Sequence, residues 1–307
     1  MKETNYLNIL YNSNTKEDFF RFYSFFKDRT ELINWMKNRK KSLPSIIDVP
    51  GDDKYVVVIP TIDSMGSYAS NCKLNLFNGL HIIFVESGHD AYFNYAHNLN
   101  LGFREAMKFH PDWVIFSNDD MYSIDKVSVL KNQLTSFQVE TPDVVYTNPA
   151  GKYHSYMVNI GESSFIRKLA FKMVKNLRYK IELERNFSKL LSLKYFAYAS
   201  TFPYSLLLRY SKPIINIGSF GVFSYDYIKA KGGSLFDETY INGYEDLDLS
   251  LRLRMDNSAN VGFIKYRIED IIGGSLGKHS SVRTYRSLMN LAYFNQKLEN
   301  KELCIEG

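Results

Sequence analysis

The chain has 307 residues, enough for one large α/β domain with an appendage, and its 45% apolar and 23% charged content is ordinary for a globular protein. A net charge of +5 is too modest to require a nucleic-acid partner, and none is expected. The two cysteines, Cys72 and Cys304, have no metal-ligand spacing, so a reducing compartment fits better than a disulfide framework. The N-terminus leads into no apolar signal core, and no stretch approaches the roughly 18 apolar residues of a membrane span. We therefore expect a cytoplasmic protein, not secreted, that is soluble or lies on a membrane surface.

Residues 1–53 are predicted to form an N-terminal helical accessory segment. Apolar side chains recur there near helical spacing, and basic residues 37–41 follow, as is favourable near a helix C-terminus. Pro44 and the turn at 50–53 mark the boundary. We expect the segment to pack on a main domain that spans 54–307.

Three apolar runs after residue 54 predict strands buried on both faces of a sheet. They cover residues 55–59, 81–86 and 112–117, and a helical pattern lies between the last two. This alternation predicts an α/β fold with a mostly parallel central sheet. Ligands of such sheets bind beyond the carboxyl ends of the strands. The polar or acidic segments 60–63, 86–88 and 118–120 follow the three runs directly.

Residues 163–212 are predicted to form a basic helical insert, with eleven Lys and Arg along the segment. Such a basic amphipathic stretch could be a solvated helical face or could lie on an anionic membrane surface. A strand pattern resumes at 214–218, and a helix is predicted to begin near Glu245.

Asn118, Asp119 and Asp120 directly follow a predicted buried strand. Two carboxylates there would repel each other unless a counter-charge is present, and Mg²⁺ or Mn²⁺ prefers such oxygen ligands. The alternative is that these acids cap the next helix, since Asp is a good N-cap residue.

Glu245 and Asp246 begin the helix predicted after the 243–244 turn. The positive end of the helix dipole is expected to keep them ionised, as a general base requires, although helix capping is the alternative. Asp248 and Arg252 have the spacing of an ion pair on one helix face, so Asp248 is interpreted as structural.

The order of these motifs resembles the inverting glycosyltransferases of the GT-A fold, in particular glycosyltransferase family 2. The resemblance extends over residues 54–295. The matching residues, in chain order, are Pro60, Thr61, Glu86, Asn98, 100–106, 118–120, 218–221, 236–238, 245–248, His279, 283–286 and Asn290.

The resemblance implies a Rossmann-like GT-A fold and a metal-dependent inverting transfer of a sugar. The donor would be a nucleotide-diphosphate sugar, and the acceptor a hydroxyl of a saccharide, a lipid-linked glycan or a protein. The implied nucleotide-sugar pocket consists of Pro60, Thr61, Asp63, Glu86, Asn98, Asn118 and Asp119. The implied ligands of Mn²⁺ or Mg²⁺ are Asp120, Asp119 and His279. Asp246 is implied to be the general base and Glu245 to orient the acceptor. The acceptor side would include Gly218, Gly221 and Tyr244.

Three other interpretations compete with this one. A sugar nucleotidyltransferase would need a Gly-rich, basic loop after the first strand, and residues 60–66 lack one. A non-catalytic nucleotide-sugar-binding protein could share the fold, but the presence of both metal and base motifs argues against it. The third interpretation makes the basic 163–212 stretch the functional surface.

Overall fold

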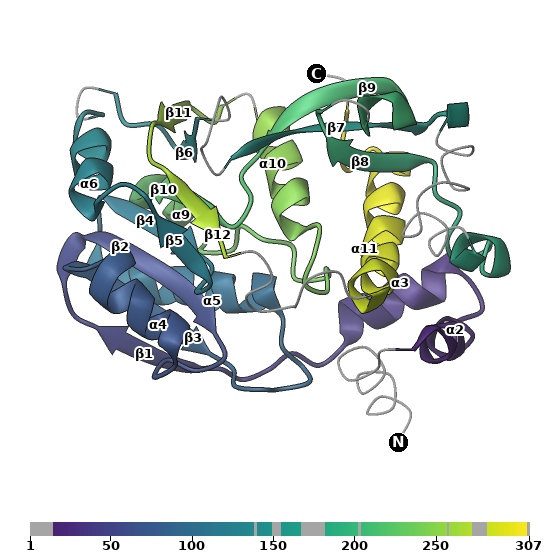
Figure 1. Ribbon diagram of the computed structural model, residues 1–307, viewed down its shortest axis with the longest axis horizontal. Helices are drawn as coiled ribbons and strands as arrows, with labels where there is room; N and C mark the ends of the chain where they lie inside the picture. Colours follow the sequence, from purple (N-terminus) through teal and green to yellow (C-terminus); the bar gives the residue numbers. More distant parts are fainter. Residues whose placement is uncertain are drawn as a thin grey trace.

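The computed structural model describes residues 15–137, 140–148, 155–166, 182–201, 204–256, 258–271 and 281–305. Its central sheet has seven strands in the order β1-β3-β2-β4-β10-β6-β11 (Figure 1). In that order they are Ser45–Val49, Leu80–Glu86, Asp52–Thr61, Trp113–Ser117, Phe220–Ser224, Val144–Thr147 and Val261–Ile264. Strands β1 and β10 run antiparallel to their neighbours, and the other five share one direction. The expected α/β fold with a mostly parallel sheet is thus confirmed.

Two smaller antiparallel sheets accompany the central one. Strands β5 (Met121–Ser123) and β12 (Ile268–Asp270) form the first. The second has the order β8-β7-β9, with β7 at Tyr156–Ser163, β8 at Tyr195–Ala199 and β9 at Leu208–Asn216. The α-helices are α2 (Lys16–Tyr23), α3 (Arg29–Asn38), α4 (Ser67–Asn71), α5 (Tyr95–Ala106), α6 (Val127–Thr135), α9 (Tyr225–Ala230), α10 (Glu245–Met255) and α11 (Ser281–Glu299). Short helical turns occur at Cys72–Leu76, Met107–Phe109 and Tyr204–Leu207.

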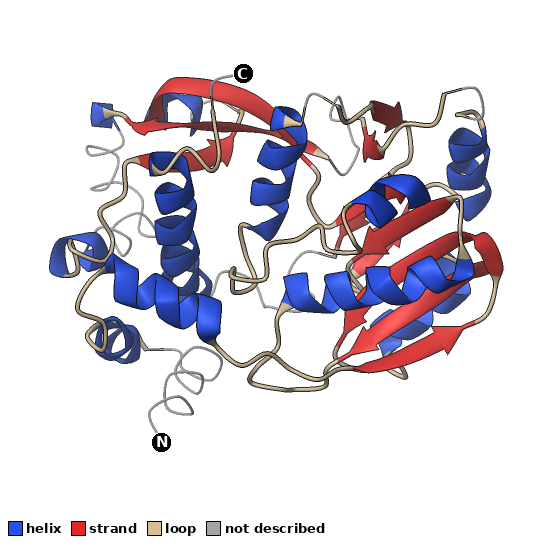
Figure 2. Cartoon of the chain, turned by 180° about the vertical axis from the view of Figure 1, so that it is seen from behind, coloured by secondary structure: helices blue, strands red, loops and turns tan. Residues whose placement is uncertain are grey.

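Strand β2 is apolar at consecutive positions because helices cover both faces of the sheet (Figure 2). Val56 and Val58 pack with the apolar face of α5, whereas Val57 and Ile59 pack with residues of α4 and α6. Helix α5 lies very close to the sheet at Gly102, where a Cβ atom would stand 2.2 Å from Val58 Cγ1. Gly102, part of the predicted helix motif at 100–106, therefore serves helix–sheet packing.

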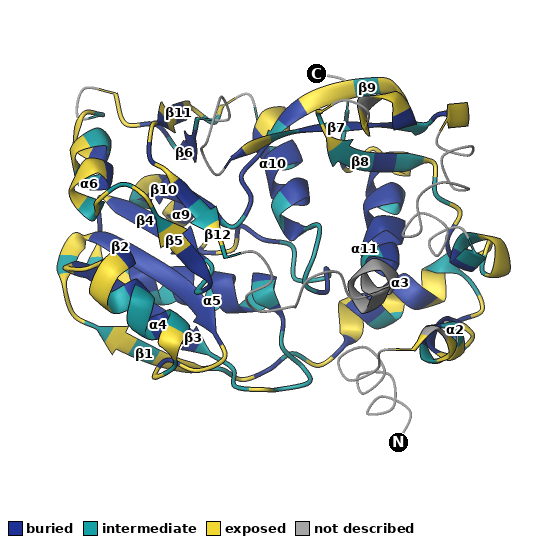
Figure 3. Cartoon of the chain, viewed as in Figure 1, coloured by how far each residue is buried: buried dark blue, intermediate teal, exposed yellow. Residues whose placement is uncertain are grey.

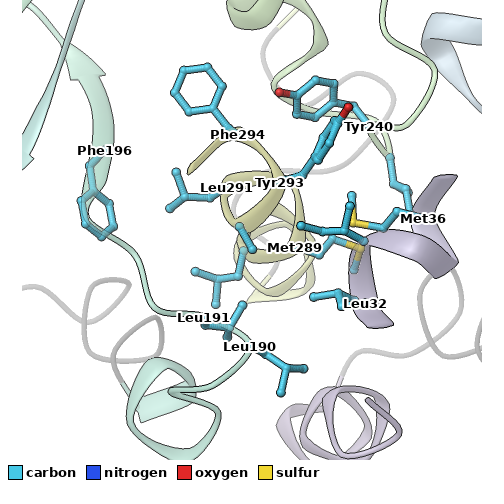
Figure 4. Packing of buried hydrophobic residues seen from close by; sticks show 14 of the residues in the cluster. Leu32, Met36, Leu190, Leu191, Phe196, Tyr240, Met289, Leu291, Tyr293 and Phe294 are labelled. Atoms are coloured by element: carbon cyan, nitrogen blue, oxygen red, sulfur yellow. The ribbon is translucent and has the colours of Figure 1, made fainter. Parts of the chain in front are cut away.

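The three-stranded sheet shares a second core with the helices of both chain ends. In Figure 4, Leu32 and Met36 of α3 lie near Met289 of α11. Phe196 of β8 belongs to the same buried cluster. Figure 3 shows the buried sides of α10 and α11 in this region. The N-terminal helices are therefore part of a core that the C-terminal helix completes.

Two expectations about secondary structure need correction. The segment 1–53 is not wholly helical, because Ser45–Val49 forms the edge strand β1, paired with β3. The described part of 163–212 contains strands β8 and β9 rather than a continuous helix, while 167–181 lies outside the described residues. Both errors concern short, half-exposed strands whose periodicity is weak and whose pairing partners are distant in sequence. Within the described residues, no helix is both long and apolar enough to span a membrane.

Candidate functional site

The carboxyl ends of β2 and β3 and the segment after β4 bring predicted site residues together. The Thr61 hydroxyl, at the end of β2, donates a 2.7 Å hydrogen bond to Asp119 Oδ2. Glu86, at the end of β3, accepts a 2.7 Å hydrogen bond from the Ser64 backbone N–H. In the same loop, Asp63 Oδ1 accepts a 2.8 Å hydrogen bond from the Met65 backbone N–H. These contacts arise because parallel strands end at the same edge of the sheet.

Two carboxylates lie next to each other at this edge. Burial raises the pKa of Asp119, and the charge of Asp120 raises it further, against the effect of the Thr61 hydrogen bond. Asp120 is itself buried. Burial and then the charges of Asp119 and Asp120 raise the pKa of the Cys72 thiol to about 12. A cation would relieve this concentration of negative charge.

Several buried polar atoms near the strand ends have no hydrogen-bond partner within the part of the chain that the structure describes. These atoms are Ser87 Oγ, Tyr95 Oη, Asn98 Oδ1 and Asn118 Oδ1. An unsatisfied buried polar group costs about 1–3 kcal/mol, so four of them in one region suit a polar ligand that would supply partners. Asn98 and Asn118 are among the predicted nucleotide-sugar residues, and Ser87 lies in the polar segment 86–88 predicted to follow the second strand. Nothing in the sequence pointed to Tyr95.

Tyr95 connects the strand ends with the second acidic motif. Burial raises its pKa well above the ordinary value, and the negative charges of Glu245, Asp246, Asp270 and Asp120 raise it further. The hydroxyl of Tyr95 therefore lies in the field of both predicted acidic motifs. The fold thus brings Asp120 and the two acids of the second motif to one hydroxyl, although they are more than 120 positions apart in the sequence.

Helix α10 begins at Glu245, as predicted, after a backbone turn with left-handed residues. Asn242 has φ 50° and Tyr244 has φ 75°, and Tyr244 caps the helix without a side-chain hydrogen bond. Asn242 Oδ1 accepts a 2.9 Å hydrogen bond from the Tyr95 backbone N–H, which ties the turn to the start of α5. This tie positions Glu245 and Asp246 beside Tyr95.

The protonation of Glu245 differs from the expectation. Burial, reinforced by the charge of Asp246, raises the pKa of Glu245 to about 8, although Gly243 N–H donates to Oε2 at 2.5 Å. Burial also raises the pKa of Asp246. The helix dipole was expected to keep both acids ionised, but for Glu245 the removal of the carboxylate from water outweighs the dipole. Glu245 thus carries a proton near neutral pH.

Asn216, at the end of β9, holds Asp246 in place and was not predicted from the sequence. Its Nδ2 donates to Asp246 Oδ2 at 2.7 Å, and its Oδ1 accepts from Ser250 Oγ at 3.0 Å. The same amide nitrogen donates to the Tyr156 hydroxyl at 2.8 Å. The only available signal was one amide inside the apolar run 214–217. The Asn216 hydrogen bond offsets part of the effect of burial, which still leaves the pKa of Asp246 raised.

The remaining predicted residues have varied positions. Gly221 lies within β10, where a Cβ atom would stand 2.5 Å from Ile217 Cδ1, so its described role is packing. Pro60 is buried within β2, and Gly218 occupies a left-handed turn before β10. The Tyr244 ring packs against Phe294, with centroids 5.5 Å apart. His279 lies outside the described residues. Asp248 pairs with Arg252 at 2.6 Å, which confirms its structural role.

Asp119 and Asp120 fit a divalent cation by their chemistry, since both are carboxylates at a buried, negatively charged edge. Among the described residues, no group of three His, Cys, Asp or Glu side chains is placed to hold a metal ion. These two acids would therefore share a cation with ligand oxygens, as is usual for Mg²⁺ bound together with phosphates.

Comparisons with known proteins give no functional assignment. No protein-family model matches the chain, and no curated protein matches its sequence. Among solved structures, HddC from Yersinia pseudotuberculosis aligns with 76% of this chain and 78% of its own, at 11% sequence identity and a TM-score of 0.29. So low a TM-score carries no argument, and the chemistry of the site rests on its own residues.

Proposed function

We propose that this protein is a metal-dependent inverting glycosyltransferase that moves a sugar from a nucleotide-diphosphate donor to a hydroxyl acceptor. The observation that carries the proposal is the convergence of the two acidic motifs on one buried hydroxyl. The turn before α10 is held at Tyr95 by the 2.9 Å hydrogen bond from the Tyr95 backbone N–H to Asn242 Oδ1, and the charges of Glu245, Asp246 and Asp120 all raise the pKa of the Tyr95 hydroxyl. A transferase needs such an arrangement, because leaving group and nucleophile must be handled at one centre.

The strand-end residues would bind the donor. Asn98 and Asn118 present buried side-chain oxygens that have no partner among the described residues and can accept hydrogen bonds from a nucleotide sugar. Asp119 and Asp120 would hold Mn²⁺ or Mg²⁺, which when bound would offset negative charge on the diphosphate leaving group. Thr61 keeps Asp119 oriented through its 2.7 Å hydrogen bond.

The α10 residues would activate the acceptor. Asp246 would take the proton of the acceptor hydroxyl while the acceptor oxygen bonds to the anomeric carbon and the bond from that carbon to the diphosphate breaks. Glu245, protonated near neutral pH, can donate a hydrogen bond to the acceptor and so orient it. Attack from the side opposite the leaving group would invert the anomeric centre.

Two substitutions separate donor binding from chemistry. A thermal-shift series with UDP-, GDP-, CDP- and dTDP-sugars, each with and without Mn²⁺, should reveal a nucleotide whose stabilising effect requires metal. Asp120→Ala should abolish that metal-dependent shift. Asp246→Asn should keep the shift but reduce transfer by at least about a thousandfold, because an amide cannot accept the proton.

Either of two results would count against the proposal. No shift with any nucleotide, in folded protein, would favour an interpretation without a nucleotide sugar. A metal-dependent shift without transfer by the wild-type protein to any saccharide or lipid-linked acceptor would favour a non-catalytic binding protein on the same fold.

A further inference from the structure

Large apolar side chains gather, exposed, at the end of β9 that is farther from Asn216. Phe165 is 73% exposed and Tyr210 is 79% exposed. The group, called here the β9 tip, consists of Phe165, Ile166, Tyr204, Leu206 and Tyr210. Isolated exposed apolar residues are common, but a contiguous group of them marks an interaction surface. Figure 3 shows exposed residues at the outer end of β9 and just beyond the end of β7.

Hydrogen bonds and strand register place these residues together. Ser164, which precedes Phe165, donates through its backbone N–H to Leu207 O at 3.0 Å and through its hydroxyl to Leu206 O at 2.8 Å. Ser163 pairs with Leu208 in the β7–β9 ladder. Phe165 and Ile166 therefore leave β7 directly beside the segment 204–210.

The backbone at Tyr210 is strained, although its ring is exposed. Tyr210 has φ 49°, in the left-handed region, close to the point where the β7–β9 register shifts between Ile160 and Glu162. This conformation costs about 1–2 kcal/mol for a residue with a Cβ atom. Burial of the ring does not offset this strain, because the Tyr210 side chain is 79% exposed.

Basic side chains flank the tip. Lys194 and Arg209 both reach Glu162, at 2.9 and 3.0 Å, and Lys212 is exposed on the same strand as Arg209. The Arg209 guanidinium also lies 5.6 Å from the centre of the Tyr210 ring. Among the described side chains named here, the three bases outnumber the one acid, Glu162, so the described surroundings of the tip carry net positive charge.

We propose that the β9 tip docks on an anionic membrane surface. Tyrosine, phenylalanine and leucine side chains would enter the headgroup layer while Lys and Arg pair with lipid phosphates. The cationic rim favours a lipid surface of opposite charge over an uncharged apolar protein partner. Strand β9 has nine residues and runs from the tip to Asn216, so roughly 25 Å separates the tip from the candidate site. Docking would leave that site open. The membrane proposal therefore holds or fails independently of the proposed transfer reaction.

Vesicle co-sedimentation of the full chain tests the proposal. The protein should pellet with vesicles of equal parts phosphatidylcholine and phosphatidylglycerol, should not pellet with phosphatidylcholine alone, and should be released by added salt. The double variant Phe165→Ser, Tyr210→Ser should bind at least roughly tenfold more weakly, because two interfacial anchors are lost. The matched control is Val261→Ser, Phe263→Ser, which removes two exposed side chains from β11.

The control variant should bind like the wild type, and melting temperatures should show that both variants are folded. The proposal is overturned if the wild-type protein does not pellet with the anionic vesicles. It is also overturned if the tip variant and the β11 variant bind equally well. Concentration-dependent self-association that the tip variant abolishes, without vesicle binding, would instead make the tip a contact between copies of this chain.

Discussion

At the scale of single residues, the burial of Glu245 makes stability depend on pH in an unusual direction. Its pKa is about 8 in the folded state, against an ordinary value of 4.5. The folded protein therefore keeps a proton that the unfolded chain has already released between about pH 5 and pH 8. Stability from this group is present at low pH and is lost as the pH rises through that window.

Glu245→Gln should remove this dependence. Glutamine can still accept the Gly243 N–H hydrogen bond and carries no charge to desolvate. We expect the variant to be more stable than the wild type at pH 9, by on the order of 2–4 kcal/mol, and nearly equal at pH 5. Urea unfolding at both pH values measures the difference. Parallel stability curves for the two proteins would show that Glu245 is ionised throughout.

Asn216 gives a second residue-scale prediction that rests on the proposed reaction. Its hydrogen bond stabilises the charged form of Asp246, so Asn216→Ala should raise the pKa of that carboxyl further. The acidic limb of the pH–rate profile should move to higher pH, and kcat at neutral pH should fall roughly tenfold. Tyr156→Phe, which removes another partner of the same amide, should leave the limb nearly unchanged. A uniform loss of rate at all pH values would indicate a purely structural role.

At the scale of elements, the N-terminal helix α3 should contribute to stability through one buried face. Leu32 of α3 is fully buried in the cluster with α11, whereas Leu43, in the following segment, is 91% exposed. Leu32→Ala should destabilise the protein by about 2–4 kcal/mol, and Leu43→Ala by less than about 0.5 kcal/mol. Chemical denaturation measures both. Equal, small effects would mean that α3 packs loosely.

The elements that sequence reasoning predicts correctly are those whose local pattern is strong. The runs in β2, β3 and β4 are buried on both faces, and the start of α10 carries three acids in its first turn. Strands β1 and β8 and the first part of β9, before the strand pattern predicted at 214–218, escape prediction because their pairing partners, not their own patterns, define them.

The same contrast applies to the candidate site. Asp119, Asp120, Glu245 and Asp246 belong to short motifs that can be recognised locally. Tyr95 and Asn216 do not, because each is distinguished only by contacts with residues far away in the chain. The ionisation of Glu245 also escapes prediction, since it depends on burial that the complete fold produces.

At the scale of the whole molecule, Glu238 connects three separate parts of the chain. It accepts hydrogen bonds from Lys41, which follows α3, at 3.0 Å, and from His97 and Asn100 of α5 at 2.9 and 3.0 Å. Burial alone would raise the pKa of Glu238, but these partners outweigh it and lower the pKa to about 2. This linkage has the opposite sign to that of Glu245: it stabilises the fold above the ordinary pKa and is lost as the pH falls towards 2.

Acidification should therefore loosen the junction between the N-terminal segment, α5 and the loop before α10. Between about pH 5 and pH 3 the wild type should lose roughly 2 kcal/mol of unfolding free energy through this group, a loss that Glu238→Gln should not show. Urea unfolding across that range measures, for the wild type and for Glu238→Gln, the slope of unfolding free energy against pH. Glu302→Gln is the control for removing an exposed carboxylate near the C-terminus. Equal slopes for the wild type and Glu238→Gln would contradict the assignment. A steeper slope in the wild type alone would mean that one half-buried carboxylate, that of Glu238, holds the N-terminal segment to the sheet domain that carries the candidate site.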